Sequence, residues 1–299
     1  MKIINYNQIS SNLDKIDINT IIVLKDNAYG FGLYSILRLL IEKGFTFFAV
    51  TKASEAIKIT NLYKNTHVLI LGKEKVLNQN NIYITVEDED DFLFATKHKV
   101  YFHLKIRSKM NRFGTDKVKY ADSSLCKGIY YHIGENKEKM VLKELRLFET
   151  LTKNYKDKII HIGGSIILNY DTYLIKRIAY RIYSNSLYLY GKIIKIISIN
   201  MFNSVGYHSS FKALKKTRVG IINIGYNSGL LRDNKGKYVF INDKKYKLIG
   251  FKCMDYCFVK IDNSVMVNDR VEFLGDKISL TELAKEEKRN EYELLINLK

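Results

Sequence analysis

A chain of 299 residues, 46% of them hydrophobic, can bury a core of its own and is long enough for one large domain or two ordinary ones. It contains no run of about 18 uncharged apolar residues and no signal-peptide pattern, which excludes a membrane span and favours a cytoplasmic protein. The formal charge of +18 does not indicate a nucleic-acid partner, because the lysines are dispersed beside abundant Ile, Asn and Tyr and form no basic stripe.

Eight short runs rich in β-branched and aromatic residues divide the first part of the chain. They cover residues 20–25, 45–50, 67–72, 82–86, 100–106, 128–133 and 159–162, with a weaker eighth at 175–182. Stretches that can form helices alternate with these runs. Two of them carry apolar residues at helical spacing, namely Leu33, Ile36, Leu37, Leu40 and Ile41 before a stop at Gly44, and Val141, Leu145, Phe148 and Leu151.

Strand-then-helix repetition of about eight units predicts a parallel sheet, covered by helices, that closes into a TIM-like α/β barrel. We place this barrel domain at residues 1–185, which is short for the fold. Such barrels carry their chemistry at the C-terminal ends of their strands. Lys25, Arg112 and His132 each lie at or just beyond such an end and are therefore candidate site residues.

The sequence changes character after about residue 185. Segments such as SLYLYGKIIKIISI, RVGIINIGY, KYVFI and RVEFLG alternate polar and apolar residues, with Gly and Asn-Asp turns between them. This pattern predicts a separate, mostly β domain at residues 186–299.

The segment VLKDNAYGFG, residues 23–32, carries the most specific chemical signal. A strand-like run ends at Lys25, and a glycine-bearing turn and an amphipathic helix follow. A lysine that is partly desolvated near other cations loses its proton easily and can attack an aldehyde. Taken alone, however, a lysine at a strand end is more often a solvated cap.

The whole string is similar to the cofactor-lysine signature of the alanine racemase family, except that Phe31 stands where a histidine is usual. The resemblance implies that Lys25 carries pyridoxal 5'-phosphate covalently. It also implies that Tyr29 hydrogen-bonds the cofactor phosphate.

Further motifs follow in the family's order along essentially the whole chain. FAVTKASEA resembles the second-strand segment, and MNRFG, residues 110–114, looks like the motif whose arginine binds the substrate carboxylate. The resemblance makes Arg112 this arginine, and a planar guanidinium suits the task because it grips a carboxylate in two places. It also implies that Lys105, at a position often carbamylated in the family, orients Arg112.

The same resemblance assigns cofactor contacts later in the barrel. His132 in GIYYHIG matches a histidine that supports the second base and the cofactor arginine, and Ser165 in HIGGS matches a phosphate-binding serine. Arg177 in RIAYRIYS matches the arginine at the pyridine nitrogen, and Ala179-Tyr180 matches the pair whose backbone amides receive the phosphate. A cation at that nitrogen disfavours ring protonation, which implies racemisation; decarboxylases on a similar barrel place a carboxylate there.

Racemisation needs one base on each face of the substrate Cα. In the family the second base is a tyrosine, and VGY ending at Tyr207 matches its motif, while IGYNSG around Tyr226 matches the next. Met254 and Asp255 in GFKCMDYCFVKI match the segment whose methionine backbone contacts the substrate carboxylate. Because the β domain of one subunit completes the barrel site of the other in this family, the resemblance implies a homodimer with shared active sites.

Four departures from the family pattern bear on activity. Arg107-Ser108-Lys109 stands where Asp-Thr-Gly is usual, and Lys109 replaces a glycine that could need positive φ. Ala179-Tyr180 replaces a glycine and an apolar residue beside the phosphate. Asn227-Ser228 replaces Ala-Asp, and the sequence ends before the family's basic C-terminal segment with its phosphate-contacting tyrosine.

These observations favour an alanine racemase that interconverts L- and D-alanine for peptidoglycan synthesis, with Lys25 and Tyr207 as the two bases. A racemase of serine or of broader specificity, and a degenerate relative that binds the cofactor with little activity, remain alternatives. Neither a nucleic acid nor a membrane is expected as a partner. The six histidines and three cysteines stand at no metal-ligand spacing, so no metal site is expected.

Overall fold

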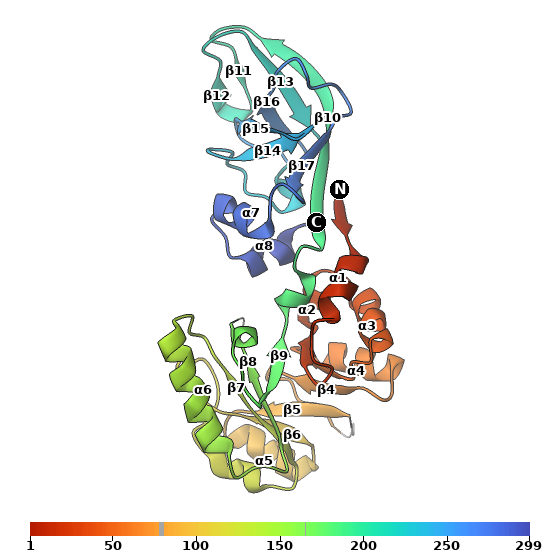
Figure 1. Cartoon of the computed structure of the whole chain (residues 1–299), viewed down its shortest axis with the longest axis vertical. Helices are drawn as coiled ribbons and strands as arrows, with labels where there is room; N and C mark the ends of the chain where they lie inside the picture. Colours follow the sequence, from red (N-terminus) through yellow and green to blue (C-terminus); the bar gives the residue numbers. More distant parts are fainter. Residues whose placement is uncertain (78–80, 165) are drawn as a thin grey trace. The chain divides into compact units, whose positions relative to one another are not determined.

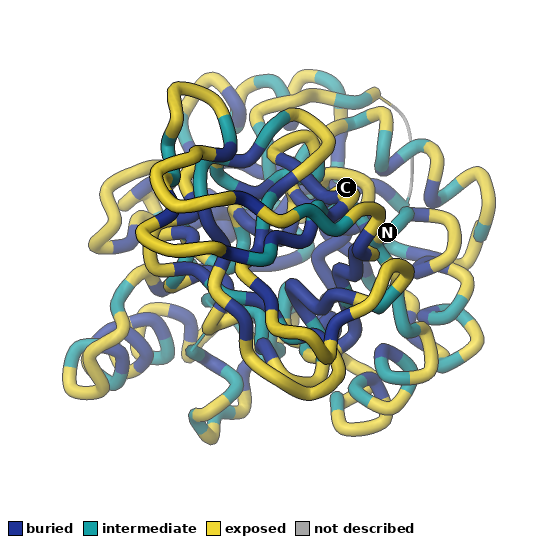
Figure 2. The backbone as a smooth tube through the Cα atoms, turned by 90° about the horizontal axis from the view of Figure 1, so that it is seen from above, coloured by how far each residue is buried: buried dark blue, intermediate teal, exposed yellow. Residues whose placement is uncertain are grey.

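The computed structural model describes residues 1–77, 81–164 and 166–299 (Figure 1). These residues form two compact units: Ser10–Ile182 make up the first, and Met1–Ile9 with Tyr183–Lys299 make up the second. Buried and exposed stretches alternate along the chain, as the burial colours of Figure 2 show. No described helix combines the length and the apolar character needed to cross a membrane.

Eight parallel strands close into a barrel in the first unit, which confirms the predicted fold. The strands are β2 (Ile21–Val23), β3 (Phe47–Val50), β4 (His67–Ile70), β5 (Ile82–Val86), β6 (Phe102–Lys105), β7 (Cys126–His132), β8 (Ile159–Gly163) and β9 (Ile175–Ile178). Each pairs with the next, and β9 pairs with β2 through Arg177 and Ile21 to complete the ring. Most strand residues are buried on both faces, which explains why these strands read as continuous apolar runs.

Within the residues that the structure describes, α-helices cover the crossovers after four of the barrel strands. They are α3 (Leu33–Glu42), α4 (Ala53–Leu62), α5 (Glu89–His98) and α6 (Glu138–Thr152), after β2, β3, β5 and β7. The buried face of α3 consists of Leu33, Ile36, Leu37 and Leu40, four of the five residues that the helical spacing picks out. In the described parts of the crossovers after β6 and β8, the only helical elements are the 3₁₀ turns η1 (Val118–Asp122) and η2 (Ile167–Asn169), which keeps this barrel short.

The second unit is an antiparallel β domain. Its sheet has the order β1 (Lys2–Ile4), β10 (Leu187–Ile199), β13 (Thr217–Ile222), β16 (Cys257–Lys260), β15 (Lys244–Ile249), β14 (Tyr238–Ile241), β17 (Arg270–Leu274). The long strand β10 also pairs with β17, so β10, β13, β16, β15, β14 and β17 close into a second barrel, while β11 and β12 form a separate two-stranded sheet. Asn242 and Asp243 both have positive φ in the hairpin turn between β14 and β15, the geometry that two-residue hairpins favour.

Short elements complete the second unit and join it to the barrel. They are α1 (Tyr6–Leu13), η3 (Tyr180–Tyr183), β11 (Ser204–Val205), η4 (Tyr207–Ser209), β12 (Phe211–Lys212), η5 (Tyr226–Ser228), α7 (Leu280–Glu287) and α8 (Glu291–Asn297). A capping box of Ser279 and Glu282 begins α7. Glu287 at its end is buried and accepts hydrogen bonds from Lys237 Nζ at 2.7 Å and Leu231 N at 2.5 Å, so α7 fastens the loop before β14.

Candidate active site

Lys25 lies two residues beyond the end of β2, at the start of a turn with an unusual backbone. The next four residues, Asp26 to Tyr29, all adopt left-handed conformations with φ of 54° or 55°. Left-handed geometry costs an ordinary residue about 1–2 kcal/mol, so a run of four needs support from its surroundings. This turn, labelled α2 (Lys25–Tyr29) in Figure 1, leaves Lys25 Nζ 5.7 Å from the centre of the Tyr29 ring.

Hydrogen bonds from two helices supply that support. The Asn27 Oδ1 atom accepts a hydrogen bond from the backbone N of Leu33 at 2.8 Å, where α3 begins. Glu55 Oε1 on α4 accepts from the backbone N of Asn27 at 3.2 Å. The turn is therefore held from both sides, and it holds Lys25 and Tyr29 at the C-terminal end of β2 in a strained geometry of the kind that functional sites use.

Arg177 and His132 meet across the same end of the barrel because of the strand register. His132 lies beside Gly163, and Gly163 lies beside Arg177, on β7, β8 and β9. A Cβ on Gly163 would stand 2.4 Å from Arg177 Nη2, so only glycine lets the guanidinium cross this strand. Arg177 Nη2 then reaches His132 Nδ1 at 3.4 Å.

The buried Arg177 side chain also leads into a pair of buried histidines inside the barrel. Its Nη1 donates to His161 Nδ1 at 3.1 Å, and His161 Nε2 lies 2.8 Å from His103 Nδ1. A guanidinium can only donate hydrogen bonds, so His161 accepts through Nδ1 and is neutral. The proton of His161 is therefore on Nε2, which donates a hydrogen bond to Nδ1 of His103. Arg177 thereby sets the tautomers of both His161 and His103. Arg177 itself is a cation with no acidic partner among the described residues.

The buried histidines should make the stability of the fold depend on pH. Burial, followed by nearby positive charge, lowers the pKa of His132 and of His103 to about 3, and burial lowers the pKa of His161 well below its usual value. An unfolded histidine titrates near 6.5, so the unfolded chain binds more protons between about pH 3 and 6.5. Stability is therefore full above pH 6.5 and falls as the pH drops through this window.

We expect a loss of roughly 2 kcal/mol for each of these histidines between pH 7 and pH 5. Urea unfolding at a series of pH values measures it, and His103→Gln should flatten the dependence by about one third. Equal unfolding midpoints at pH 7 and pH 5 would show that the folded protein protonates these rings.

Arg112 lies on the loop between β6 and η1. The loop closes through a bridge between Ile106 and Thr115, and Gly114 has φ of +113° with its Cα against the backbone of Arg107, so no larger residue fits there. Arg112 is exposed, and its Cζ lies 5.8 Å from the centre of the Phe113 ring. The loop thus presents the guanidinium at the C-terminal end of β6.

Lys105 ends β6 and is buried beneath the same loop. Its Nζ lies 4.7 Å from the centre of the Phe113 ring and 3.3 Å from Glu87 Oε2. Burial lowers the pKa of Lys105, and the charge of Glu87 opposes this shift. Lys105 and Arg112, the two predicted partners, therefore both lie against the Phe113 ring.

The unusual residues of this loop do not distort it. Arg107 turns outward and pairs with Asp116 at 3.0 Å. Lys109 does not have positive φ; the positive-φ positions of the loop are Asn111, with φ of 50°, and Gly114. The extra cations therefore sit on the exposed side of the loop.

Two of the predicted phosphate contacts follow β9 directly. Ala179 follows β9 and Tyr180 begins η3, and both residues are half-buried. Tyr29, a third predicted contact, is buried on the turn after Lys25. Ser165, the fourth, lies outside the described residues.

Positive charges are in excess at this end of the barrel. Besides burial, the four cations Arg177, Arg112, Lys105 and Lys25 all lower the pKa of His132, in that order. A cluster of cations around a neutral imidazole suits an anionic ligand that carries a phosphate or a carboxylate. In the described part of the chain, no group of three or more His, Cys, Asp or Glu side chains is placed to hold a metal ion.

The remaining predicted residues lie together in the second unit. Gly225 packs against the backbone of Met254, and the backbone N atoms of Tyr226 and Asn227 donate to the carbonyls of Cys253 and Met254 at 3.0 Å each. Asn227 Nδ2 also lies 3.5 Å from Asp255 Oδ1. The structure therefore joins the motifs around Tyr226, Met254 and Asp255 into one surface, with Ser228 beside it on η5.

Tyr207 lies on η4 in the same unit and is 56% exposed. The Arg232 guanidinium lies over the Tyr207 ring at 5.7 Å and over the Phe251 ring at 5.1 Å. Such stacking restrains an exposed aromatic ring by a cation–π attraction of about 0.5–1 kcal/mol. Arg232 is thus a neighbour of the predicted base that motif reading did not single out.

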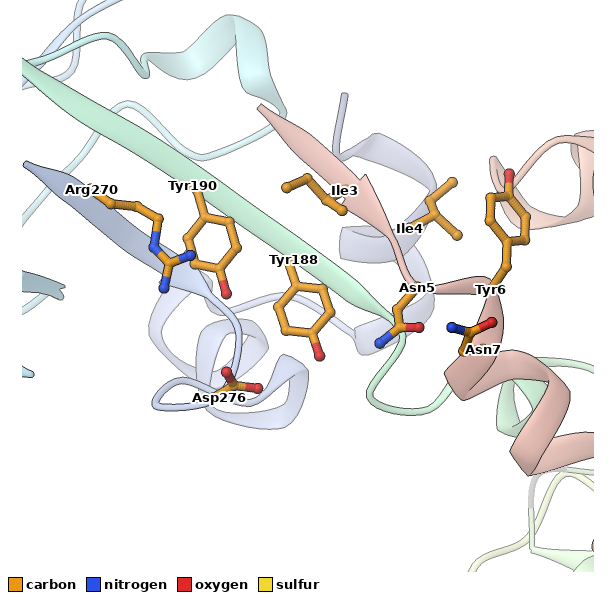
Figure 3. Close-up of a pocket in the computed structure, with 9 residues that line it drawn as sticks. All are labelled: Ile3, Ile4, Asn5, Tyr6, Asn7, Tyr188, Tyr190, Arg270 and Asp276. Carbon is orange, nitrogen blue, oxygen red and sulfur yellow. The ribbon is translucent and has the colours of Figure 1, made fainter. Parts of the chain in front are cut away.

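A pocket of about 550 Å³ lies elsewhere in the second unit and contains none of the predicted residues (Figure 3). Tyr188 and Tyr190 stack in it with ring centres 5.8 Å apart, and the Arg270 guanidinium lies 4.4 Å above Tyr190. Three tyrosines share its lining with two isoleucines, two asparagines, Arg270 and Asp276, so it is a mixed polar and apolar pocket.

The fold makes this an α/β-barrel protein, and the cations at its strand ends suit an anionic ligand. Comparison with known proteins makes this class more specific. Family profiles for the alanine racemase N-terminal domain and C-terminal domain match residues 4–173 and 187–299. The chain belongs to the alanine racemase family, which confirms the resemblance seen in its motifs.

Individual relatives agree with this assignment. Alanine racemase from Borreliella burgdorferi strain ZS7 is 28% identical over 349 aligned positions, with 99% of this chain and 94% of that protein covered. Alanine racemase from Helicobacter acinonychis is 26% identical over 336 positions, with 94% and 88% covered.

Solved structures show the same fold at lower identity. Alanine racemase from Bartonella henselae, solved with covalently bound pyridoxal phosphate, has a TM-score of 0.87 at 20% identity, with 100% of this chain and 96% of that chain covered. The Bacillus anthracis enzyme, solved with bound L-Ala-P, has a TM-score of 0.84 at 20% identity, with 100% and 92% covered.

Proposed function

We propose that this protein is a pyridoxal-phosphate-dependent alanine racemase that interconverts L- and D-alanine. The observation that carries the proposal is the convergence of Lys25, Arg112 and Arg177 around neutral His132 at one end of the barrel. Membership of the alanine racemase family supports it. The bound L-Ala-P of the Bacillus anthracis structure supports alanine as the substrate.

The residues present fit the cofactor. Gly163 leaves space for the Arg177 guanidinium, whose partners are neutral imidazoles and not carboxylates, so it can donate to a pyridine nitrogen. Lys25 would hold the cofactor covalently, and Tyr29 with Ala179, Tyr180 and Ser165 would hold its phosphate. When bound, the cofactor withdraws electrons from the substrate Cα and so makes the Cα proton acidic.

The chain's own residues would bind the substrate and move its proton. Arg112 would grip the carboxylate of alanine, and Lys105 would steady Arg112 through the shared Phe113 ring. Lys25 would remove or return the Cα proton on one face. Tyr207 of a partner subunit would do so on the other, in a homodimer whose Met254 loop closes the site.

The test is chiral analysis of alanine incubated with the purified protein and pyridoxal phosphate. L-alanine should approach equal amounts of the two enantiomers, and serine and larger amino acids should react more slowly. A protein that binds the cofactor yet forms no D-alanine would contradict the proposal, and faster turnover of serine would shift it to the broader racemase. We place the activity in the cytoplasm, where it would supply D-alanine for peptidoglycan.

A further inference from the structure

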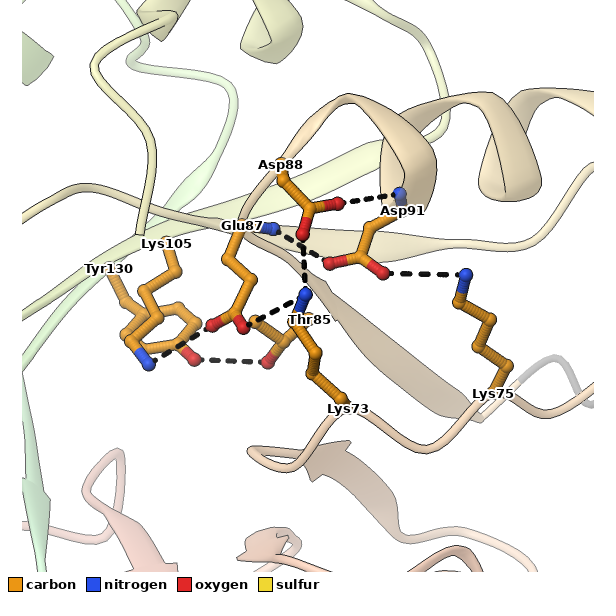
Figure 4. A network of polar contacts seen from close by, with 8 residues as sticks. All are labelled: Lys73, Lys75, Thr85, Glu87, Asp88, Asp91, Lys105 and Tyr130. Atoms are coloured by element: carbon orange, nitrogen blue, oxygen red, sulfur yellow. Dashed lines mark hydrogen bonds and ion pairs between the residues drawn. The ribbon is translucent and has the colours of Figure 1, made fainter. Parts of the chain in front are cut away.

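A buried carboxylate stands at the end of the barrel strand next to Lys105. Glu87 directly follows β5, is only 7% exposed, and lies with Oε2 3.3 Å from Lys105 Nζ (Figure 4). Its other oxygen, Oε1, lies 3.7 Å from Lys73 Nζ. A buried carboxylate is costly to leave unpaired, so Glu87 depends on these two ammonium groups.

The surroundings of Glu87 fix it in this position. Its backbone N donates to Asp91 Oδ2 at 3.3 Å at the start of α5, and Lys73 is held in turn by Asp88 at 2.5 Å. Asp91 pairs with Lys75 at 3.5 Å and does not contact Lys105 (Figure 4). Of the two buried acids of this network, Glu87 alone therefore faces the cationic end of the barrel.

Lys105 needs such a partner because other cations lie close to it. Arg112 and Arg177 both act on Lys105 as nearby positive charges, and Glu87 acts on it as the opposing negative charge. The ammonium rests against Phe113, the ring that Arg112 also contacts. Loss of the Glu87 charge would leave three buried or neighbouring cations without compensation, and Arg112 would move away from Lys105.

We propose that Glu87 is a positioning residue for Arg112: it holds Lys105 as an unmodified ammonium ion against Phe113 and so sets the place of the carboxylate-binding guanidinium. The role given to Arg112 rests on the proposed function. The state of Lys105 does not, because it follows from the Glu87–Lys105 pair alone.

The pair also excludes the modification that the family resemblance suggests for Lys105. To form a carbamate, the lone pair of a neutral lysine nitrogen attacks the carbon of CO₂, the N–C bond forms as one C–O π bond opens to a carboxylate, and the nitrogen loses a proton to water. The product is an anion. Beside Glu87 it would bring two buried negative charges into contact, whereas the ammonium form is attracted to the same carboxylate.

Carbon-13 NMR reads the state of Lys105 directly. The protein loaded with pyridoxal phosphate, equilibrated with ¹³C-bicarbonate at pH 8, should show no carbamate resonance that is lost in Lys105→Arg. A carbamate resonance in the wild-type protein that disappears in Lys105→Arg would overturn the proposal. This measurement requires neither turnover nor a variant of Glu87, so it stands even if the protein proves unable to racemise alanine.

Steady-state kinetics tests the positioning role. Glu87→Gln should raise the KM for alanine about tenfold and change kcat less, because the substrate grip weakens while Lys25 is untouched. Glu87→Asp, which keeps the charge, should recover part of the loss. Asp91→Asn is the matched control: it neutralises the neighbouring buried acid, while its amide oxygen can still accept the hydrogen bond from Glu87 N, so KM should stay within about twofold of wild type.

An unchanged KM in Glu87→Gln, with the fold intact by circular dichroism, would show that Glu87 only balances charge. Equal effects of Glu87→Gln and Asp91→Asn would show a general loss of stability at the start of α5. Either result overturns the positioning role. Absence of racemisation by the wild-type protein would instead contradict the proposed function.

Discussion

Lys25→Ala is expected to abolish both cofactor attachment and the formation of D-alanine. The variant loses the amine that would bind pyridoxal phosphate and, with it, the base on one face of the substrate, so we expect racemisation to fall by at least about 10³-fold. The wild-type protein should be yellow and lose its visible absorption on borohydride treatment. Lys25→Ala should show no covalently retained cofactor after the same treatment, as measured by intact mass.

Lys52→Ala provides the matched control. Lys52 follows the neighbouring barrel strand β3 as Lys25 follows β2, but it is exposed and lies on no left-handed turn. It should retain both the colour and the activity. Covalent cofactor on another lysine in Lys25→Ala, together with undiminished racemisation, would show that a different amine performs the chemistry.

The barrel could be predicted from the sequence because each strand has a local signature. A parallel strand buried on both faces is a short, continuous apolar run, and all eight runs correspond to strands. The pairing of β1 with β10 has no such signature. It joins Lys2 to Leu189 across most of the chain, and three residues of ordinary composition do not indicate a distant partner.

The candidate site could be predicted where a residue ends a strand or belongs to a motif. His132 ends β7, Lys25 lies two residues past β2 and Arg112 lies on the loop after β6, all on the C-terminal side of their strands, where barrel geometry places chemistry. Glu87 also follows a strand, but it begins the acidic run EDEDD, which is typical of a helix N-terminus. Its pairing with Lys105 depends on the lateral register of β5 and β6, which only the folded barrel sets.

The backbone conformation of the turn after Lys25 could not be predicted from the sequence either. The string DNAY contains no glycine, so nothing in it predicts four successive left-handed residues. Backbone hydrogen bonds within the turn stabilise it, together with the hydrogen bonds from Leu33 on α3 and to Glu55 on α4, and the latter two depend on the packing of distant helices. The catalytic roles of Lys25 and Tyr207 stay predictions, and a variant of Tyr207, the proposed second base, tests both.

Tyr207→Phe should separate proton removal from racemisation. If Tyr207 serves one face of the substrate and Lys25 the other, loss of the phenol should slow racemisation by about 10²–10⁴-fold. Exchange of the Cα proton with D₂O should continue for one enantiomer, because Lys25 still reaches its face. Tyr256→Phe, which removes a similarly exposed phenol from the same unit, should leave both rates unchanged. Equal loss of exchange for both enantiomers would contradict the two-base assignment.

Mixing the two inactive variants tests the shared site. In a symmetric dimer with shared sites, a Lys25→Ala subunit would lend its intact Tyr207 to the barrel of a Tyr207→Phe subunit, which keeps Lys25. One of the two sites in each mixed dimer would then be wild type. Statistical subunit exchange makes about half of the dimers mixed, so the mixture should recover about one quarter of wild-type activity. Recovery requires that the two residues act on one substrate from different chains, since a site built within a single subunit would stay inactive in every combination.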